Sequence, residues 1–208
     1  MASKSFDKDT KKQEILHAAL KAFARNGVAK TKMEDIAEIA GIGKGTIYEY
    51  FRSKEDIFIE SYNQFSEAPD KKIKQIIQSD NGPDVKLKLF VDETVCVLLR
   101  DNSEFIGILF EFWSEAIKAK NEKVFNVINF KCMYQTFRKA VTDILDEGVK
   151  KGIFRPMDTR LAASVFLSMT DGVILQWIMD PEAFTPEEIS DIIIDTFFNG
   201  TKLDKNNF

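Results

Sequence analysis

The 208-residue sequence holds few of the residues on which most enzyme and metal sites depend. Its only histidine is His17, and its only cysteines are Cys96 and Cys132. A metal site needs several ligands at suitable spacing, and the sequence shows no such cluster. Because it also lacks a nucleophile–base pair and a phosphate-binding loop, we expect no catalytic residues, no metal and no cofactor, and a helical enzyme is only a remote alternative.

Long apolar runs are also missing from the sequence. No segment approaches the ~20 apolar residues that cross a bilayer, and residues 1–12 contain no apolar signal core. Both cysteines fall within helical apolar patterns, so we expect core packing rather than a disulfide, with a thiol sensor as the alternative. These absences predict a cytoplasmic protein with no membrane partner.

The sequence does contain helical periodicity along most of its length. The five prolines lie at or near the ends of the periodic segments, and no alternating strand pattern competes. The sequence therefore predicts an all-α protein of about nine helices, with a frayed stretch over residues 1–7 and a break or kink at Pro69. We expect the helices at 8–26, 32–40, 43–52, 53–69 with a brief continuation over 71–78, 83–100, 102–120, 121–151, 158–179 and 186–198.

Charge is divided unevenly between the two parts of the chain. The net charge is only -4, which alone argues weakly against a nucleic-acid partner. Residues 1–55 nevertheless carry 11 Lys and Arg against 8 Asp and Glu, whereas residues 56–208 carry 18 against 25. A small basic region ahead of an acidic body is typical of a nucleic-acid reader joined to a second domain.

Two short helical patterns meet at Gly41. Thr31 is expected to cap the first helix with Glu34 as its capping-box partner, and Gly41 to end that helix in the left-handed conformation. In the second helix Ile47 and Phe51 lie four residues apart and should face inward. The remaining side chains then face outward: Lys44, Gly45, Thr46, Tyr48 and Tyr50.

This arrangement is typical of a helix-turn-helix that reads DNA. Lys44 and Thr46 are placed to meet base edges, the glycines let the backbone approach closely, and the tyrosine hydroxyls with Lys54 are candidates for phosphate contacts. Short helix pairs separated by glycine also occur in helical proteins that bind no nucleic acid. The continuation of the pattern on both sides of the turn favours the DNA-binding interpretation.

Residues 15–58 resemble the TetR family of bacterial transcriptional regulators, most specifically in GIGKGTIYEYFRSKEDIF. The resemblance implies a three-helix DNA-binding domain over residues 1–53 and a larger helical ligand-binding and dimerisation domain over 54–208. Gly43 and Glu34 depart from the family pattern, and we expect Glu34 to turn back into its own cap. The implied DNA contacts are Thr31, Lys32, Lys44, Gly45, Thr46, Tyr48, Tyr50 and Lys54.

The last two predicted helices mix small residues with large apolar ones. Small residues permit close helix contact, and two helices from each of two subunits can form a four-helix interface with twofold symmetry, as the resemblance also implies. Packing within one chain is the alternative. The predicted interface residues are Ala163, Phe166, Val173, Trp177, Ile189, Ile193 and Phe197.

The middle helices are rich in aromatic and methionine residues. Such residues suit a cavity for a lipophilic or aromatic effector, with Glu111, Asp171 and Gln176 as the few polar partners. Stripes of this kind are also typical of an ordinary core. The predicted ligand contacts are Phe90, Thr94, Leu98, Leu109, Phe110, Trp113, Met133, Tyr134, Phe137, Phe166 and Met169.

The sequence therefore favours a homodimeric, ligand-responsive repressor that binds a palindromic double-stranded operator. A small lipophilic or aromatic effector would release the DNA by favouring another spacing of the two reading helices. The alternatives are a DNA-binding organiser of the same fold with no small-molecule effector and, more remotely, a helical enzyme.

Overall fold

The computed structural model describes residues 2–100, 106–108, 110 and 130–201, in which helices are joined by turns and loops and no strand occurs. The all-α prediction is confirmed. Predicted helices and residues within 101–105, 109 and 111–129 lie outside the described part of the chain. The described elements are α1 (Ala2–Asn26), α2 (Met33–Ile39), α3 (Lys44–Tyr50), α4 (Lys54–Gln78), α5 (Pro83–Val91), the π-helix η1 (Asp92–Val97), α8 (Phe130–Lys150), α9 (Thr159–Met179) and α10 (Pro186–Thr201).

Two predicted helix boundaries are wrong. Helix α1 begins at Ala2 rather than at Lys8, because polar residues can extend a helix without contributing to a buried face. Helix α4 runs unbroken through Pro69. Proline removes one backbone hydrogen bond from a helix interior, and this 25-residue helix tolerates the loss.

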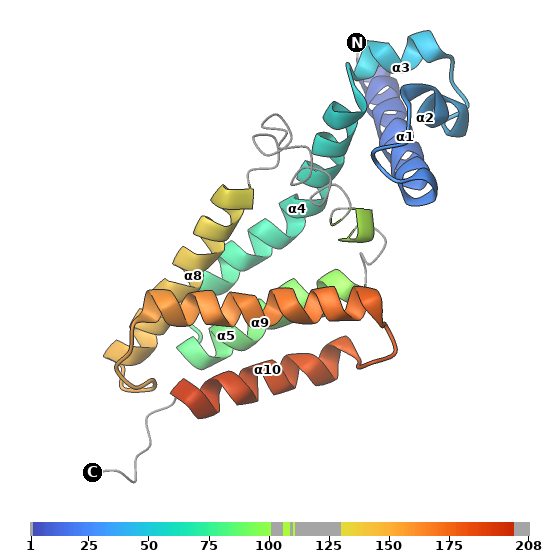
Figure 1. Cartoon of the computed structure of the whole chain (residues 1–208). Coiled ribbons are helices and arrows are strands. Elements are labelled where there is room, and N and C mark those ends of the chain that lie inside the picture. Colours follow the sequence, from blue (N-terminus) through green and yellow to red (C-terminus); the bar gives the residue numbers. More distant parts are fainter. Residues whose placement is uncertain (1, 101–105, 109, 111–129, 202–208) are drawn as a thin grey trace. The chain divides into compact units, whose positions relative to one another are not determined.

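The described residues belong to two compact units. The first contains residues 2–67, 106–108 and 110, and the second contains 68–100 and 130–201, so that α4 contributes residues to both. In the first unit α2 packs against α1 and α3 follows α2 (Figure 1). Its core includes Ile15, Phe23 and Ile36, and the Phe23 ring meets the Phe58 ring edge-on with centroids 6.0 Å apart. The expected boundary between residues 53 and 54 stays a prediction.

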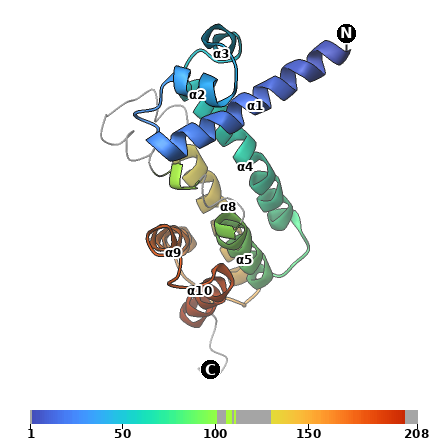
Figure 2. The same ribbon diagram turned by 90° about the vertical axis from the view of Figure 1, so that its right-hand side faces the viewer.

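The second unit is organised around α5 and η1, which contact α8, α9 and α10 between them (Figure 2). A chain of aromatic rings holds these helices together. Phe90 of α5 meets Phe137 of α8 at 5.8 Å and Phe166 of α9 at 6.2 Å, and Phe166 meets Phe197 of α10 at 4.9 Å. Edge-on and tilted ring pairs of this kind add stability beyond the burial of their area.

Helix ends in both units follow local sequence signals. The Ser53 hydroxyl accepts the Asp56 N–H (3.1 Å), and the Asp158 carboxylate accepts the Leu161 N–H (3.0 Å). Thr185 and Glu188 form a reciprocal capping box at the start of α10. Ser53, Asp158 and Thr185 therefore cap the helices that follow them, and each cap depends only on residues three positions apart.

Helix α9 corrects one expectation about apolar segments. Within the described residues it is the helix whose length and composition would allow it to cross a membrane. The prediction that no segment approaches that length is therefore wrong. The reason is that α9 is apolar on two opposite faces, one packed against its neighbours and one exposed.

Candidate functional site

The turn between α2 and α3 is closed by backbone hydrogen bonds of the Schellman type. Gly41 takes a left-handed conformation with φ of 65°. The Ile42 N–H donates to the Ala37 carbonyl (3.0 Å), and the Gly41 N–H donates to the Glu38 carbonyl (3.1 Å). A residue with a Cβ is disfavoured at this φ. The predicted role of Gly41 is confirmed, and it fixes the angle at which α3 leaves α2.

Helix α3 separates a buried side from an exposed one. Ile47 is fully buried and Phe51, directly after the helix, is nearly so, as predicted. Lys44 and Gly45 are exposed, Thr46 and Tyr50 are half-buried, and Tyr48 is 46% exposed. Of the predicted contact residues of α3, Lys44, Gly45 and Tyr48 are therefore the exposed ones, and the helix is anchored by one buried isoleucine.

Gly45 has open space where a side chain would be. A Cβ added there would meet no atom within 4 Å, so nothing in the protein itself requires glycine at this position. The residue is also exposed and lies in the first turn of α3. A glycine that the fold does not need is typical of a backbone that approaches a partner closely.

Lys44 forms an ion pair with Glu34 of α2. The hydrogen bond between them lowers the pKa of Glu34 and raises the pKa of Lys44, so both groups stay charged at neutral pH. The expectation that Glu34 turns back into its own cap is wrong. Asp35 takes that role instead, since its carboxylate accepts the Lys32 N–H at 2.9 Å. Glu34 therefore orients the cation at the start of the reading helix.

Thr31 does not cap α2, because the helix begins two residues later, after Lys32. Its hydroxyl donates to the carbonyls of Ala22 (3.2 Å) and Gly27 (2.7 Å), and the residue is 1% exposed. A side chain with this burial presents no surface to DNA. The prediction of Thr31 as N-cap is wrong, since the fold directs the hydroxyl back onto α1. The same burial argues against its predicted side-chain contact with DNA.

Lys54 is also directed inward. Its ammonium donates to the carbonyls of Val28 (2.7 Å), Ala29 (2.8 Å) and Thr31 (3.0 Å). The sequence predicted a phosphate contact for this lysine, whereas the structure places it on the backbone between α1 and α2. Nothing in the sequence near residue 54 signals these distant carbonyl groups.

The predicted dimer interface falls largely on the inner face of α9 and α10. Ala163, Phe166, Ile193 and Phe197 are all at most 6% exposed within the single chain. They pack in the core of their own unit, and this burial favours the alternative of packing within one chain. Val173, Trp177 and Ile189 are half-buried.

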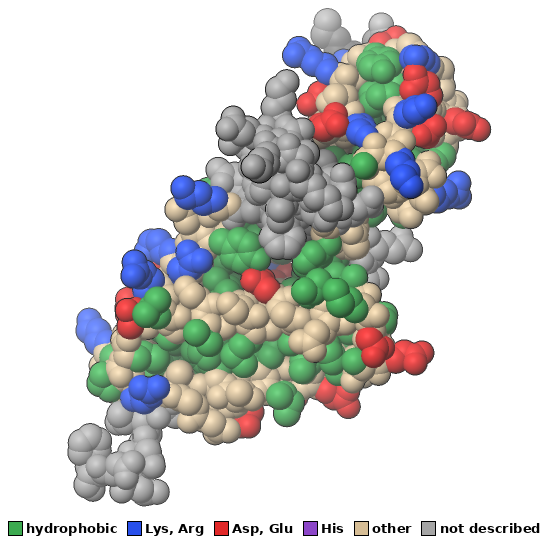
Figure 3. Space-filling model, in the orientation of Figure 1, with side chains coloured by type: hydrophobic (Ala, Val, Ile, Leu, Met, Phe, Trp, Pro, Cys, Tyr) green, Lys and Arg blue, Asp and Glu red, His purple; other side chains and the backbone are tan. Residues whose placement is uncertain are grey.

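A different face of α9 carries exposed apolar side chains, visible as a band along α9 and α10 in Figure 3. Val165 is 58% exposed and Met179 is 75% exposed. Ser168 and Gly172 lie between the large residues at helical spacing, and a Cβ added at Gly172 would meet nothing within 4 Å. We call this surface the α9 stripe; its large members are Leu161, Val165, Leu175 and Met179. Ile192 of α10 is also exposed. The three- and four-residue spacing of the α9 side chains in the sequence is the signal of a single helix face.

The predicted ligand contacts divide by burial. Phe90 and Phe166 are fully buried in ring contacts, and Leu109 and Trp113 lie outside the described residues. The others are half-buried: Thr94, Leu98, Phe110, Met133, Tyr134, Phe137 and Met169.

Tyr134 is bound to a polar partner on the neighbouring helix. Its hydroxyl donates to the Asp171 carboxylate at 3.0 Å. Burial raises the pKa of Asp171, although the hydrogen bond from Tyr134 opposes this, and burial also raises the pKa of Tyr134. Asp171 was predicted as one of the few polar groups in this region, and the structure pairs it with a predicted ligand contact.

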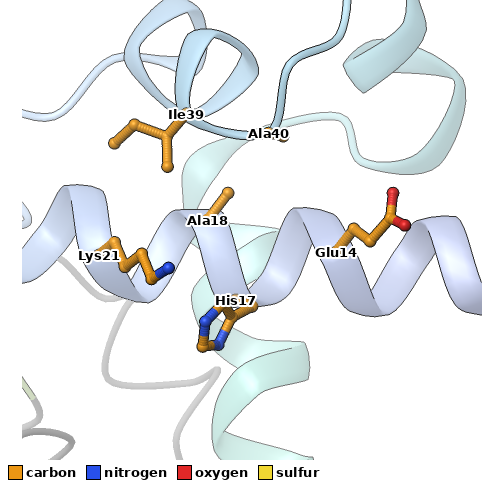
Figure 4. Close-up of a pocket in the computed structure, with 6 residues that line it drawn as sticks. All are labelled: Glu14, His17, Ala18, Lys21, Ile39 and Ala40. Atoms are coloured by element: carbon orange, nitrogen blue, oxygen red, sulfur yellow. The ribbon is translucent and has the colours of Figure 1, made fainter.

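A shallow pocket lies between α1 and α2, lined by Glu14, His17, Ala18, Lys21, Ile39 and Ala40 (Figure 4). Ile39 and Ala18 point toward each other, whereas His17 points away from α2. Across the described ranges, no group of three or more His, Cys, Asp or Glu is placed to hold a metal ion. The titratable groups that line the pocket are Glu14, His17 and Lys21, all from α1.

Comparisons with known proteins agree with this arrangement. Residues 15–60 match the model for bacterial regulatory proteins of the tetR family, and residues 83–197 match the model for the C-terminal part of BetI-type transcriptional repressors. The chain is 26% identical to the fatty acid metabolism regulator protein of Bacillus subtilis, over 93% of this chain and 96% of that protein. It is 29% identical to the repressor KstR2 of Mycolicibacterium smegmatis, over 86% and 85%.

Solved structures show the same similarity. FadR from Bacillus subtilis in complex with stearoyl-CoA has a TM-score of 0.74 at 25% identity, covering 90% of this chain and 98% of that chain. FadR from Bacillus halodurans has a TM-score of 0.73, also at 25% identity, over 91% and 95%. The second family model spans more than half of the chain, and the first spans the helix-turn-helix described above. The chain therefore belongs to the TetR family of bacterial transcriptional regulators, with a C-terminal region of the BetI repressor type.

Proposed function

We propose that this protein is a dimeric repressor that binds a palindromic operator and releases it when a lipophilic acyl compound binds the second unit. The observation that carries the proposal is the exposed polar surface of α3, held by a buried Ile47 behind a closed turn. An exposed helix of this kind can enter the major groove, where base edges present distinct donors and acceptors.

The proposed DNA contacts follow from exposure. Lys44 and Thr46 are assigned to base edges, and Gly45 to the point of closest backbone approach. Tyr48, Tyr50 and Lys32 are assigned to phosphates. Thr31 and Lys54 are left out because their side chains are engaged by backbone carbonyls. Glu34 orients Lys44 and adds a negative charge that disfavours phosphate near it.

The proposed dimer surface is the α9 stripe rather than the inner face of α9. Contiguous exposed apolar surface on a soluble protein marks an interaction site, and small residues between the large ones allow two copies of a helix to approach closely. Twofold symmetry is needed because paired reading helices meet successive major grooves about 34–36 Å apart.

The proposed effector is a long-chain acyl thioester. Two kinds of support favour it: the family relatives named for fatty acid metabolism, one of them solved with stearoyl-CoA, and the half-buried apolar side chains of α8 and α9 in the second unit. An acyl chain needs apolar walls, and Tyr134 with Asp171 supplies a polar pair among them. An effector shifts the equilibrium only by its difference in affinity for the two states.

The test is selection of bound duplexes from a random DNA pool, followed by titration of the selected duplex with stearoyl-CoA. Coenzyme A alone is the control, because it carries the polar part of the compound without the chain. We expect an enriched palindrome whose affinity falls with salt, and loss of that affinity on addition of stearoyl-CoA only.

The outcomes separate the alternatives. If no sequence is enriched, the operator-binding proposal is wrong. If a palindrome is enriched but neither stearoyl-CoA nor shorter acyl thioesters change its affinity, the acyl effector is wrong and the DNA-binding organiser is favoured.

A further inference from the structure

The Lys54 ammonium has no hydrogen left for a phosphate. An ammonium group has three N–H donors, and the Lys54 group lies 2.7, 2.8 and 3.0 Å from three carbonyl oxygens, those of Val28, Ala29 and Thr31. A phosphate could be engaged only by breaking one of these bonds. The lysine is therefore committed to the backbone of its own domain.

Lys54 lies at an electrostatically unfavourable position in its own helix. Lys54 is the first residue of α4, where the helix dipole disfavours a cation. The carbonyls that it binds follow the C-terminal end of α1, where a cation is favoured. The unfavourable interaction of the Lys54 charge with the dipole of α4 is thus offset by its favourable interaction beyond the C-terminal end of α1. The charge therefore connects the start of α4 to the segment that follows α1.

The segment that Lys54 binds is also held from the other side. Gly27 takes a left-handed φ of 76°, and the Thr31 hydroxyl and N–H both donate to its carbonyl, at 2.7 and 3.1 Å. Residues 28–31 lead directly into Lys32, which precedes α2. The segment is therefore attached to α1 through Thr31 and to α4 through Lys54, and α2 begins immediately after it.

We propose that Lys54 is a positioning residue for DNA reading: it ties the first turn of α4 to residues 28–31 and so fixes where α2 and α3 stand on α4. It makes no phosphate contact. This inference rests on the proposed operator binding. Through the tie, a displacement of the first turn of α4 is transmitted to the start of α2, and the reading helix follows through the closed turn at Gly41.

The test compares Lys54→Met with Lys44→Met, two substitutions that remove the same charge from the same domain. Operator affinity is measured across a salt series at a temperature where circular dichroism shows each variant folded. Loss of one phosphate contact lowers the slope of log affinity against log salt by about 0.9. Amide hydrogen exchange of residues 28–32 and thermal unfolding are measured on the same samples.

We expect the two variants to differ in salt slope, amide exchange and unfolding temperature. Lys54→Met should keep the wild-type salt slope, exchange faster at residues 28–32, unfold at a lower temperature and lose operator affinity relative to a random duplex even when folded. Lys44→Met should keep the wild-type exchange and unfolding temperature and lose its affinity together with a change in salt slope or base preference.

Two results would overturn the inference. A lower salt slope in Lys54→Met with unchanged exchange would make Lys54 a phosphate contact. Unchanged affinity and discrimination in the folded variant would make the tie structural only. If the wild-type protein selects no operator, the proposed function fails separately, while exchange and unfolding still report whether Lys54 holds residues 28–32.

Discussion

Helices α3 and α9 both present a surface that the core of their own unit leaves uncovered, but the two surfaces differ in kind. Helix α3 has seven residues with one buried side chain, and its free side carries Lys44, Thr46 and Tyr48. Helix α9 has 21 residues, with Ala163 and Phe166 buried on one face and the α9 stripe exposed on the other.

This difference explains why the sequence predicts the buried face of α3 but not that of α9. For a helix with one apolar and one polar side, the sequence indicates which face is buried, because only the apolar side gains from burial. A helix that is apolar on both sides does not indicate which side enters its own core and which meets another molecule. The comparison also predicts different partners: a charged, hydrated one for α3 and an apolar one for α9.

Val165→Glu should have the largest effect, because it places a charge within the α9 stripe of each subunit of the proposed dimer. Burial of an unpaired carboxylate is strongly unfavourable, so we expect monomers at micromolar concentration. Operator affinity should then fall by about 10²- to 10⁴-fold, since binding one half-site no longer raises the effective concentration at the other. Sedimentation measures the oligomeric state and fluorescence anisotropy the affinity.

The matched control is Ala183→Glu, which adds the same group at an exposed position in the turn after α9. It should stay dimeric with wild-type operator affinity. A Val165→Glu variant that remains dimeric would show that the stripe is not the interface.

How far the sequence predicts this structure depends on the distance between interacting residues. Gly41, Ser53 and Thr185 act on groups three to five residues away, and the role of Gly41 was predicted correctly. Lys54 acts on carbonyls that only the folded domain brings near it, and it was assigned to DNA instead. Local signals give helix ends, whereas the partner of a long polar side chain depends on the tertiary fold.

Prediction of the candidate site from the sequence is limited in the same way, by contacts between distant residues. The exposed side of α3 follows from the four-residue spacing of Ile47 and Phe51. The ion pair between Glu34 and Lys44 joins two helices and depends on the angle of the turn, so the sequence alone did not reveal it. For α9 the burial of Phe166 against Phe90 and Phe197 decided the inner face, and helical periodicity cannot choose between two apolar faces.

Gly45→Ala is expected to have the next largest effect and to act oppositely on stability and on binding. The added methyl group meets no atom of the protein, and alanine favours a helix over glycine by up to about 1 kcal/mol, so the unfolding temperature should rise slightly. If the backbone of α3 approaches DNA closely, the same methyl should lower operator affinity by about 10- to 100-fold, or roughly 1.4–2.8 kcal/mol.

Gly200→Ala provides the matched control for this variant. Gly200 is helical and exposed in α10, and a Cβ added there also has open space. It should gain stability without any change in DNA binding. Wild-type operator affinity in Gly45→Ala would contradict the close approach of α3 and would weaken the contrast between the two helices.

Asp171→Asn should have the smallest effect, and it probes the one acidic residue within the apolar body of α9. Burial raises the pKa of Asp171, so the charged carboxylate destabilises the folded state at neutral pH. Asparagine keeps an oxygen to accept the Tyr134 hydroxyl and removes the charge. The variant should therefore unfold at a slightly higher temperature than wild type at neutral pH.

The pH dependence of Asp171→Asn has a definite sign. An aspartate whose folded pKa is raised loses stability as pH increases from its unfolded pKa through its folded pKa. The gain in stability of the variant over wild type should therefore be complete above the raised pKa of Asp171. It should vanish below the ordinary aspartate pKa of about 3.9. Asp143→Asn is the control, because Asp143 is exposed and paired with Lys139, so it should show no such gain. A less stable Asp171→Asn at neutral pH would mean that the hydrogen bond from Tyr134 to a charged carboxylate outweighs the cost of burying it, and that α9 tolerates charge on this side more readily than on its stripe.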